Sequence, residues 1–519
     1  MSCWLNSYYM ATAAQNPTYL GAHLAWQAKT LPGKTGVVDP LRDPLNLFLA
    51  GCLSLLIICG TLAIRNDILD GFLLPVFACG VLIGPDMIAW LRGRLDTFDP
   101  LGILGAYGYF FFFLAPLLTV ALDYHTGELP EPPDWLGWIG WMSVLNAFGL
   151  VIYLVSRNLI PARAPRTIWR VKATSFLGIS SVVLPLTLAF QIYVFVKFGG
   201  ILGFMTAFSN TEYDSFIGMG WQFLIAEMFP LFLGILFLVW KRDFLRQRSW
   251  WFLAGLVSVF FILKLLCGGL RGSRSNTIWG MFWLVGAIHL WVRRVPRRAI
   301  VAGLLFLAIF MYFYGFYKQA GMGVFDAIQD PGKLDTIKEK NGRTLTALLL
   351  GDMARSEIQS YLLYRLWAVG DYDYGYGTTY LEAFDIVIPK SIWPERPDGK
   401  VRKGTEALNG RDVYNARIFH ASQVYGLAGE AMLNFSPIAA PLIFFVLAFV
   451  VAKSRGLMLA DQDDARWLLV PILANGIVLL LSGDLDNLLM FFLGVGLGPL
   501  VLLRASSQIV PNRVSTGQP

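Results

Sequence analysis

Three cations and several glycines are spaced along the sequence KLLCGGLRGSRSN at residues 264–276. Lys264, Arg271 and Arg274 are separated by 7 and 3 residues, so a helix would place them on one face. Cations in or at the end of an apolar run are costly and usually face a polar cavity or a partner. Because arginine binds phosphate bidentately, the segment predicts a cationic cradle for a phosphate or pyrophosphate. The alternative is that these side chains reach the lipid headgroups.

A second set of candidates lies in NARIFHASQVYGLAGEAMLNFSP, residues 415–437, directly before an apolar run. His420 and Glu430 are its titratable bases, and either could accept a proton at a membrane surface. We favour Glu430 as the general base, because the small residues on both sides would leave room for a substrate. His420 would then orient the acceptor. The alternatives are a hydrogen-bonded structural histidine and a Glu430 carboxylate neutralised by Arg355 or Arg417.

The third set lies on RTLTALLLGDMARSEIQSYLLYRLWAV, residues 343–369, which has apolar residues at helical spacing. Asp352 and Arg355 are three residues apart on this predicted helix and can pair. The charged residues of this set are Arg343, Asp352, Arg355 and Arg365. Arg343, Asp352 and Arg355 are candidate substrate-binding residues, together with Arg417 of the second set. The alternative is an interfacial helix with a charged face.

The composition places all of these residues in a membrane protein. Of the 519 residues, 56% are hydrophobic and only 15% are charged, whereas about a quarter are charged in soluble domains. The apolar residues fall into runs about 20 long, which matches a bilayer core of about 30 Å. This excludes a soluble enzyme, a nucleic-acid binder and a disordered scaffold. It predicts an all-α polytopic protein with twelve spans: 45–64, 71–90, 101–122, 136–155, 176–196, 221–240, 250–270, 277–292, 299–317, 437–452, 467–483 and 488–503.

The distribution of Lys and Arg predicts the orientation. With the N-terminus in the cytoplasm, the inside segments carry 23 Lys and Arg and the short outside segments carry four. Both termini are therefore expected inside. The predicted divisions are a cytoplasmic N-terminal segment (1–44), nine spans (45–317), a large periplasmic loop (318–436), three spans (437–503) and a cytoplasmic tail (504–519). A loop of 119 residues is long enough to be functional.

The sequence offers little for a metal or a cofactor. The five cysteines form no CxxC pair, and four histidines give few ways to build a metal site. No P-loop glycine pattern precedes a GK[ST], so ATP-driven transport is unsupported. We expect no metal and no cofactor.

The order of these motifs resembles one family. A late span ends in GLRGSRS, a long outside loop holds IPKSIWPERP (388–397), and SQVYGLAGEAMLNFSP (422–437) leads into the next span. This arrangement is similar to that of the Wzy-type oligosaccharide repeat-unit polymerases of O-antigen and exopolysaccharide synthesis, which are related to the O-antigen ligases. About 60 residues in the second half carry the resemblance, and the first half matches only as a hydropathy profile.

The resemblance implies a GT-C-like glycosyltransferase in the bacterial inner membrane. The donor would be a glycan on undecaprenyl pyrophosphate, and the acceptor a second lipid-linked repeat unit at the periplasmic face. Arg271 and Arg274 would hold the pyrophosphate, with Lys264 beneath them, and the reaction would invert the sugar C1 without a metal. Besides the bilayer and the lipid-linked oligosaccharide, a chain-length regulator and a flippase are the partners that such a polymerase would have; nucleic acid is not one.

Two other functions remain open from the sequence. A glycan ligase would move a finished chain to a lipid anchor or a protein. A secondary transporter also fits twelve spans with both ends inside, although the long outside loop and the lack of an internal repeat disfavour it.

Overall fold

The computed structural model describes residues 39–127, 129–209, 218–271, 274–320, 344–388, 392–395, 397, 399–415, 418–419 and 422–512. Three candidate site residues, Arg343, Arg417 and His420, lie outside the described residues, so their roles stay predictions.

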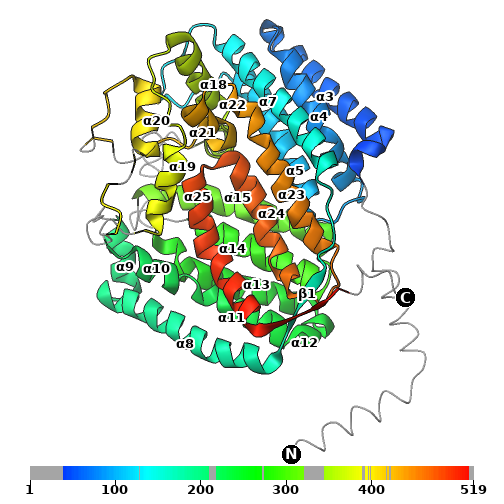
Figure 1. Ribbon diagram of the computed structural model, residues 1–519, viewed down its shortest axis with the longest axis vertical. Helices are drawn as coiled ribbons and strands as arrows, with labels where there is room; N and C mark the ends of the chain where they lie inside the picture. Colours follow the sequence, from blue (N-terminus) through cyan, green and yellow to red (C-terminus); the bar gives the residue numbers. More distant parts are fainter. Residues whose placement is uncertain are drawn as a thin grey trace, which may run out of the picture.

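The described chain is mostly helical (Figure 1). The helices of the first half are α3 (Pro44–Ile64), α4 (Leu73–Leu91), α5 (Pro100–Tyr109), α6 (Ala115–Ala121), α7 (Trp135–Leu159), α8 (Ala173–Lys197), α9 (Gly200–Ser209), α10 (Gly220–Ala226), α11 (Phe229–Trp240), α12 (Arg242–Gln247) and α13 (Trp250–Cys267). Those of the second half are α14 (Arg274–Ala287), α15 (Arg297–Ala320), α18 (Ser356–Tyr364), α19 (Thr378–Glu382), α20 (Lys400–Asn409), α21 (Gly426–Phe435), α22 (Ala439–Leu442), α23 (Phe444–Met458), α24 (Val470–Ser482), α25 (Leu485–Phe491) and α26 (Gly498–Ser506).

Shorter elements join or extend these helices. The 3₁₀ turns are η1 (Pro40–Arg42), η2 (Asn66–Ile68), η5 (Gly269–Arg271), η9 (Ala383–Ile386) and η10 (Ala465–Leu468). The π-helical segments are η3 (Phe110–Leu114), η6 (Ile288–Val292), η7 (Ala347–Met353), η8 (Arg365–Val369) and η11 (Phe492–Leu497). Strands β1 (Thr167–Val171) and β2 (Ser507–Pro511) pair antiparallel, with Trp169 opposite Ile509.

Ten helices among the described residues are long and apolar enough to cross a membrane, which confirms an all-α, multi-pass membrane protein. They coincide with ten of the twelve predicted spans. The predicted span 277–292 is formed by α14 and η6 together, and the predicted span 467–483 contains α24, an apolar helix of only 13 residues. The count of twelve spans and a GT-C-like fold therefore stay predictions.

Local sequence signals set several helix starts. Asp43 and Asp99 each precede a proline, and their carboxylates accept hydrogen bonds from Leu45 N (3.1 Å) and Leu101 N (2.9 Å). An aspartate cap followed by proline is a favoured helix start, because proline has no N–H to leave unpaired. The Asp-Pro pairs therefore account for where helices α3 and α5 begin.

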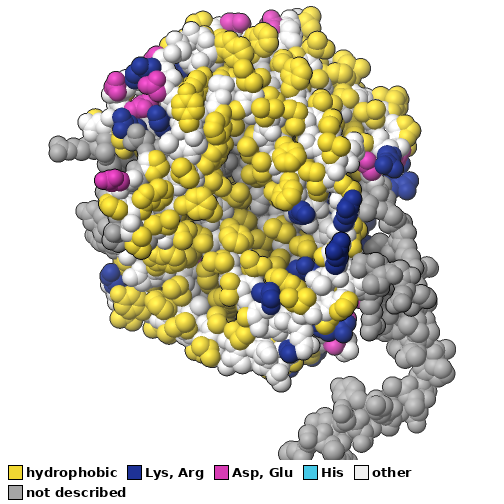
Figure 2. All heavy atoms as spheres, in the orientation of Figure 1, with side chains coloured by type: hydrophobic (Ala, Val, Ile, Leu, Met, Phe, Trp, Pro, Cys, Tyr) yellow, Lys and Arg dark blue, Asp and Glu magenta, His cyan; other side chains and the backbone are white. Residues whose placement is uncertain are grey.

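Two large hydrophobic cores and two smaller clusters lie among the described residues of the bundle, and the large cores hold most of the buried side chains. Helices α4, α5, α7, α21 and α23 contribute to one, and α11, α13, α14, η6 and α26 contribute to the other. Helix α24 belongs to both, through Ile477 and Leu481 on one side and Ile472 on the other (Figure 1). On the face seen in Figure 2, hydrophobic side chains cover most of the surface. Lys and Arg side chains lie toward the lower right of the view, and a second group of Lys and Arg lies with Asp and Glu at the upper left.

Different elements form the two ends of the bundle. Helix α24 begins beside η10, which contacts the β1–β2 ribbon, and it ends at Ser482, where α21 packs. Because α24 runs between them, the ribbon and the helices α18 to α21 lie at opposite ends of the bundle (Figure 1). We call these the ribbon end and the loop end. The described part of the predicted large loop is thus folded into helices at the loop end.

The predicted helix over 343–369 is interrupted at a position where its pattern of apolar residues is continuous. Ala354 is extended, with φ −97° and ψ 170°, between the π-helical η7 and α18. The Arg355 guanidinium turns back, and its Nη1 donates to the carbonyls of Gly351 (2.9 Å), Asp352 (3.0 Å) and Ala354 (2.7 Å). These bonds satisfy carbonyls that a continuous helix would have paired internally. The pattern of apolar residues cannot show such a break, because the helical phase continues on both sides.

The orientation predicts how cysteine variants react with a membrane-impermeant reagent. In a background without the native cysteines, Arg411→Cys at the loop end should be labelled in intact cells, whereas Arg163→Cys beside the ribbon should be labelled only after permeabilisation. Both positions lie outside the apolar helices. Labelling of Arg163→Cys in intact cells, with none at Arg411→Cys, would invert the predicted topology.

Candidate functional site

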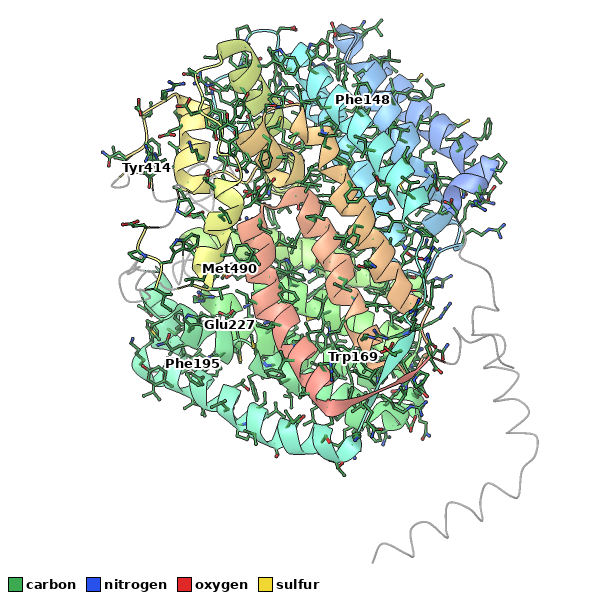
Figure 3. The ribbon with its side chains drawn as sticks, viewed as in Figure 1. Phe148, Trp169, Phe195, Glu227, Tyr414 and Met490 are labelled. Carbon is green, nitrogen blue, oxygen red and sulfur yellow. The ribbon has the colours of Figure 1, made fainter. Side chains whose placement is uncertain are left out.

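Lys264 and Arg271 are brought together as expected, but an acid from the turn between α10 and α11 lies between them. Arg271 donates to Oε1 of Glu227 through Nε (3.1 Å) and Nη2 (2.7 Å). Lys264 Nζ donates to Oδ1 of Asn276 (2.7 Å) and to the Glu227 carbonyl (3.3 Å), and Asn276 in turn donates to Oε2 of Glu227. Figure 3 shows Glu227 toward the left of the view, apart from Trp169 of the ribbon. Lys264 is therefore a fully buried partner of this network and does not face an open cradle.

Arg274 binds a different acid, although it is only three residues after Arg271 in the sequence. Its Nη2 donates to Oδ2 of Asp352 (2.7 Å), and the side chains of the pair are 15% and 35% exposed. The side chain of Arg271 is 29% exposed. Both arginine side chains are therefore partly exposed, Arg271 more than Arg274, whereas Lys264 is fully buried. Nη1 of Arg274 is buried and has no hydrogen-bond partner among the residues that the structure describes.

The expected ion pair between Asp352 and Arg355 is replaced by other contacts. The Asp352 carboxylate pairs with Arg274, as above, and Arg355 donates to backbone carbonyls. Besides the carbonyls around the helix break, Nε of Arg355 donates to the Ser482 carbonyl at the end of α24 (2.9 Å). Arg355 therefore joins two helix C-termini, whose partial negative charge favours a cation. Burial lowers the pKa of Arg355, opposed by the charges of nearby tyrosine and acidic groups.

Glu430 is enclosed by the chain. It is 4% exposed, and its two carboxylate oxygens accept hydrogen bonds from the Thr379 hydroxyl (3.0 Å) and from Leu485 N (2.8 Å). The room for a substrate that we expected beside it is filled: a Cβ on Gly429 would meet Cβ of Tyr425 at 2.7 Å. The small residues around Glu430 therefore serve close packing of α21, and the predicted reason for a catalytic role does not hold.

A second buried carboxylate lies close to Glu430. Oδ1 of Asp484 accepts hydrogen bonds from the backbone of Tyr425 (3.0 Å) and Gly426 (2.8 Å), at the start of α21. Burial raises the pKa of Asp484, and burial together with the charge of Asp484 raises the pKa of Glu430. Protons are therefore held more tightly here than by an exposed carboxyl group.

Lys400, from α20, supplies the compensating cation. Its Nζ lies 3.0 Å from Oδ2 of Asp484 and 2.7 Å from Oδ2 of Asp486. The two acids raise the pKa of Lys400 against the opposing effect of its burial. The lysine thereby ties the loop helix α20 to the junction of α24 and α25.

These groups form one continuous series at the loop end. Arg271 and Arg274 are three residues apart, Arg274 binds Asp352, and Arg355 follows Asp352 by three residues. Arg355 then contacts Ser482, two residues before Asp484, and Glu430 binds the adjacent Leu485. The structure thus brings Arg271, Arg274, Asp352, Arg355 and Glu430 into one region. We call Lys264, Arg271, Arg274 and Arg355, with Glu227 and Asp352, its arginine-rich part. We call Glu430, Asp484 and Asp486, with Lys400, its acid-rich part.

Sequence reasoning missed six members of this region: Glu227, Asn276, Thr379, Lys400, Asp484 and Asp486. Two signals were present. Glu227 is an acid inside an apolar run, which is rare without a partner, and the turn after the predicted span 467–483 holds two acids within three residues. Lys400 and Thr379 carry no such signal, because they lie in an ordinary polar segment.

Among the described residues, no group of three or more His, Cys, Asp or Glu side chains is placed to hold a metal ion. Comparisons with models of protein families, with curated proteins and with solved structures find no match for this chain. The chemistry of the site is therefore inferred from the residues that form it.

The contacts of Lys400 predict a large loss of stability when the lysine is removed. Lys400→Met leaves Asp484 buried without its cation, which typically costs about 3–5 kcal/mol. We expect a markedly lower unfolding temperature of the purified protein in detergent. The double variant Lys400→Met/Asp484→Asn should recover much of the loss, because the buried charge is also gone. A double variant less stable than Lys400→Met alone would show that the pair does not hold α20 in place.

Proposed function

We propose that the protein is a polysaccharide polymerase, a membrane glycosyltransferase that joins oligosaccharide repeat units carried on undecaprenyl pyrophosphate. The observation that carries the proposal is the pair of partly exposed arginines at the loop end, Arg271 and Arg274, which lie among apolar helices. The resemblance of the motif order to the repeat-unit polymerases gives the same substrate class. The proposed location is the periplasmic face of a bacterial inner membrane, with both termini in the cytoplasm.

The charge of the arginine-rich part suits a pyrophosphate. Lys264, Arg271, Arg274 and Arg355 carry four positive charges, against the two negative charges of Glu227 and Asp352. An anion entering beside Arg271 and Arg274 would therefore meet an excess of positive charge. Guanidinium forks match phosphate oxygens bidentately, and a site shielded from water strengthens the attraction.

The reaction exchanges one C–O bond for another. The C1–O bond of the donor sugar to pyrophosphate breaks, and its electron pair leaves with the pyrophosphate. An acceptor hydroxyl oxygen forms the new bond to C1 from the opposite face and loses its proton to a base. Arginines aimed at the leaving group stabilise the charge that develops there, a kind of contribution that is often the largest in such reactions.

For the proton acceptor we propose Asp352 in place of the buried Glu430. Asp352 is the carboxylate of the arginine-rich part that is about one-third exposed, and it lies 2.7 Å from Arg274. A pyrophosphate that takes over the Arg274 guanidinium would release the Asp352 carboxylate beside the reacting centre. Glu430 then acts as a positioning residue, because it holds Leu485 and Thr379 in place. His420, whose placement is not described, remains a candidate for orienting the acceptor.

The arginines give the first test. Arg271→Ala and Arg274→Ala should each lower polymer formation by about 100-fold or more, the usual effect of removing a group that stabilises a developing charge. Arg271→Lys and Arg274→Lys should rescue poorly, since lysine has no fork. The measurement is the ladder of polymer lengths formed by purified protein from a lipid-linked repeat unit.

Arg411→Ala is the matched control, because Arg411 also pairs with an acid at the loop end, Asp373, but lies outside the series described above. It should form a normal ladder. Normal ladders in both alanine variants at Arg271 and Arg274 would refute the proposal, and a single transferred chain without a ladder would favour the ligase.

The carboxylates give the second test. Asp352→Asn should lower the kcat of the folded fraction by about 100-fold or more, within the range expected for a general base. Glu430→Gln should lower the unfolding temperature while the folded fraction keeps most of its kcat.

The pH dependence separates the two assignments. Because the pKa of Glu430 is raised, a rate limited by its ionisation would keep rising with pH above the usual carboxyl range. A rise of that kind in the wild type that disappears in Glu430→Gln, together with an active Asp352→Asn variant, would return the base to Glu430.

A further inference from the structure

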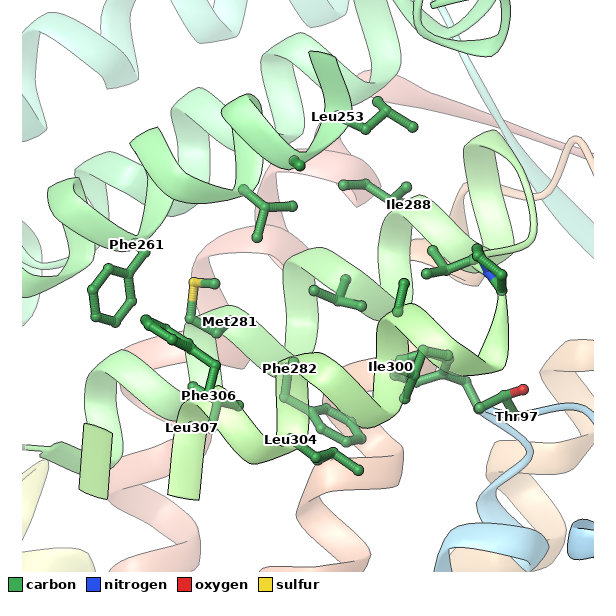
Figure 4. Close-up of a pocket in the computed structure, with 18 of the residues that line it drawn as sticks. Thr97, Leu253, Phe261, Met281, Phe282, Ile288, Ile300, Leu304, Phe306 and Leu307 are labelled. Carbon is green, nitrogen blue, oxygen red and sulfur yellow. The ribbon is translucent and has the colours of Figure 1, made fainter. Parts of the chain in front are cut away.

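A large apolar cavity lies between α5, α13, α14 and α15 (Figure 4). Its volume is about 1020 Å³, at the upper end of the range for ligand pockets. Leu253, Phe261, Met281 and Ile300 line it with the side chains around them, and polar groups are nearly absent from its wall among the described residues. Leu304 and Phe306 of α15 line the cavity and are also about half exposed, so the cavity reaches the lipid-facing surface.

The depth of the cavity follows from the contacts between α13 and α14. Toward the loop end, Lys264 packs on Gly280, just beyond Ile262 and Met281 of the cavity wall. Toward the other end, the Arg293 guanidinium lies 3.7 Å from the ring centroid of Trp250. The wall of α13 from Trp250 to Ile262 is about 18 Å long at 1.5 Å per residue. The cavity therefore runs from near the middle of the bundle toward the ribbon end.

The arginine-rich part of the site lies directly above this cavity. Arg274, Met281 and Ile288 are spaced by seven residues, about two helical turns, so they share one face of α14 and its extension. Met281 and Ile288 line the cavity. A second connection comes from η7, where Met353 lines the cavity and the adjacent Asp352 binds Arg274. Tyr107, also in the wall, donates to the Met353 carbonyl (2.7 Å) and holds this segment in place.

We propose that the cavity holds the distal part of a single polyisoprenoid chain whose phosphate lies at Arg274. Arg274 is about 10 Å above Met281 at the helical rise, so a lipid that reaches from this arginine to the bottom of the cavity extends over about 28 Å. One leaflet accounts for only about 15 Å of a 30 Å hydrocarbon core. A phospholipid acyl chain anchored at Arg274 would end near the top of the cavity, whereas a long polyprenyl chain fills it.

The inference rests on the proposed function for its choice of lipid and deepens it, because it assigns the carrier chain of the donor to a place in the fold. The cavity then selects substrate by the length of its lipid. The glycan remains at the loop end, and the polyisoprenoid chain extends from there past Met353 toward the ribbon end.

Gly303 of α15 allows a direct test. It lines the cavity, and a Cβ placed on it would have no atom within 4 Å, so a larger side chain enters the cavity without displacing the backbone. Gly303→Phe is the main variant and Gly303→Leu a milder one. Gly255→Phe is the matched control, since Gly255 on α13 has the same free space around its Cβ but is not part of the cavity wall.

The measurement is the binding of undecaprenyl phosphate, of a polyprenyl phosphate of two isoprene units and of phosphatidylglycerol to the purified full-length protein by native mass spectrometry. We expect the wild type and Gly255→Phe to bind undecaprenyl phosphate at least about tenfold more tightly than the other two lipids, a difference of about 1.4 kcal/mol. Gly303→Phe should lose about tenfold for undecaprenyl phosphate only, and Gly303→Leu less.

Equal binding of long and short chains by the wild type, or an unchanged preference in a folded Gly303→Phe variant, would overturn the proposal, as would phosphatidylglycerol binding as tightly as undecaprenyl phosphate. Because binding is measured without glycan transfer, the two proposals fail separately. Length-dependent binding in a protein that forms no polymer would refute the polymerase alone. Polymer formation with no preference for chain length would refute the cavity assignment alone.

Discussion

The neutralisation of buried charge is the constraint on which the loop end of this protein depends. A charge buried between apolar helices costs several kcal/mol unless a partner compensates it. Here each partner comes from a distant part of the chain: Glu227 for Lys264 and Arg271, Asp352 for Arg274, and Lys400 for Asp484. Ion pairs alone do not specify a helix bundle. They do fix which helix ends and loop segments meet, because an exchange of neighbours would leave a charge unpaired in an apolar environment.

The sequence predicts the helices better than it predicts their polar contacts. Apolar runs of about 20 residues locate ten membrane-crossing helices, since the length and hydropathy of a span are local properties. The partners of the charged residues are not local. Asp352 was paired with Arg355 by helical spacing, yet its carboxylate lies against Arg274, 78 positions away in the chain. Spacing rules describe contacts within one helix, whereas in a bundle each charged side chain can also contact neighbouring helices. The break at Ala354 directs the Arg355 guanidinium toward backbone carbonyls instead of Asp352.

The residues around Glu430 show the same limit for small side chains. Glycine beside a carboxylate fits either an open site or close helix packing, and a sequence does not distinguish the two. The surrounding atoms do: Tyr425 and Gln359 fill the space next to Gly429, and Thr379 and Leu485 take both carboxylate oxygens. An acid with raised pKa that is fully hydrogen-bonded and enclosed suits a role in holding the chain. An acid that is about one-third exposed beside an arginine suits the proton transfer that we propose. Exposure and contacts, more than the pKa, therefore guide the proposed assignment of these roles.

The segment that carries Asp352 connects the polar and apolar parts of the site. Two adjacent residues of its π-helical turn have different environments. The Asp352 carboxylate accepts a hydrogen bond from Arg274, and the Met353 side chain lines the cavity. π-Helical turns also border the cavity at Phe110 and at Ile288. Such turns often occur at functional sites. A lipid chain that enters the cavity must pass Met353. A phosphate that binds Arg274 must either displace the Asp352 carboxylate or share the guanidinium with it. Occupancy of the cavity and release of the carboxylate would therefore act on the same few residues. In the reaction that we propose, a lipid of the right length and headgroup would prepare the base that the transfer of its glycan requires.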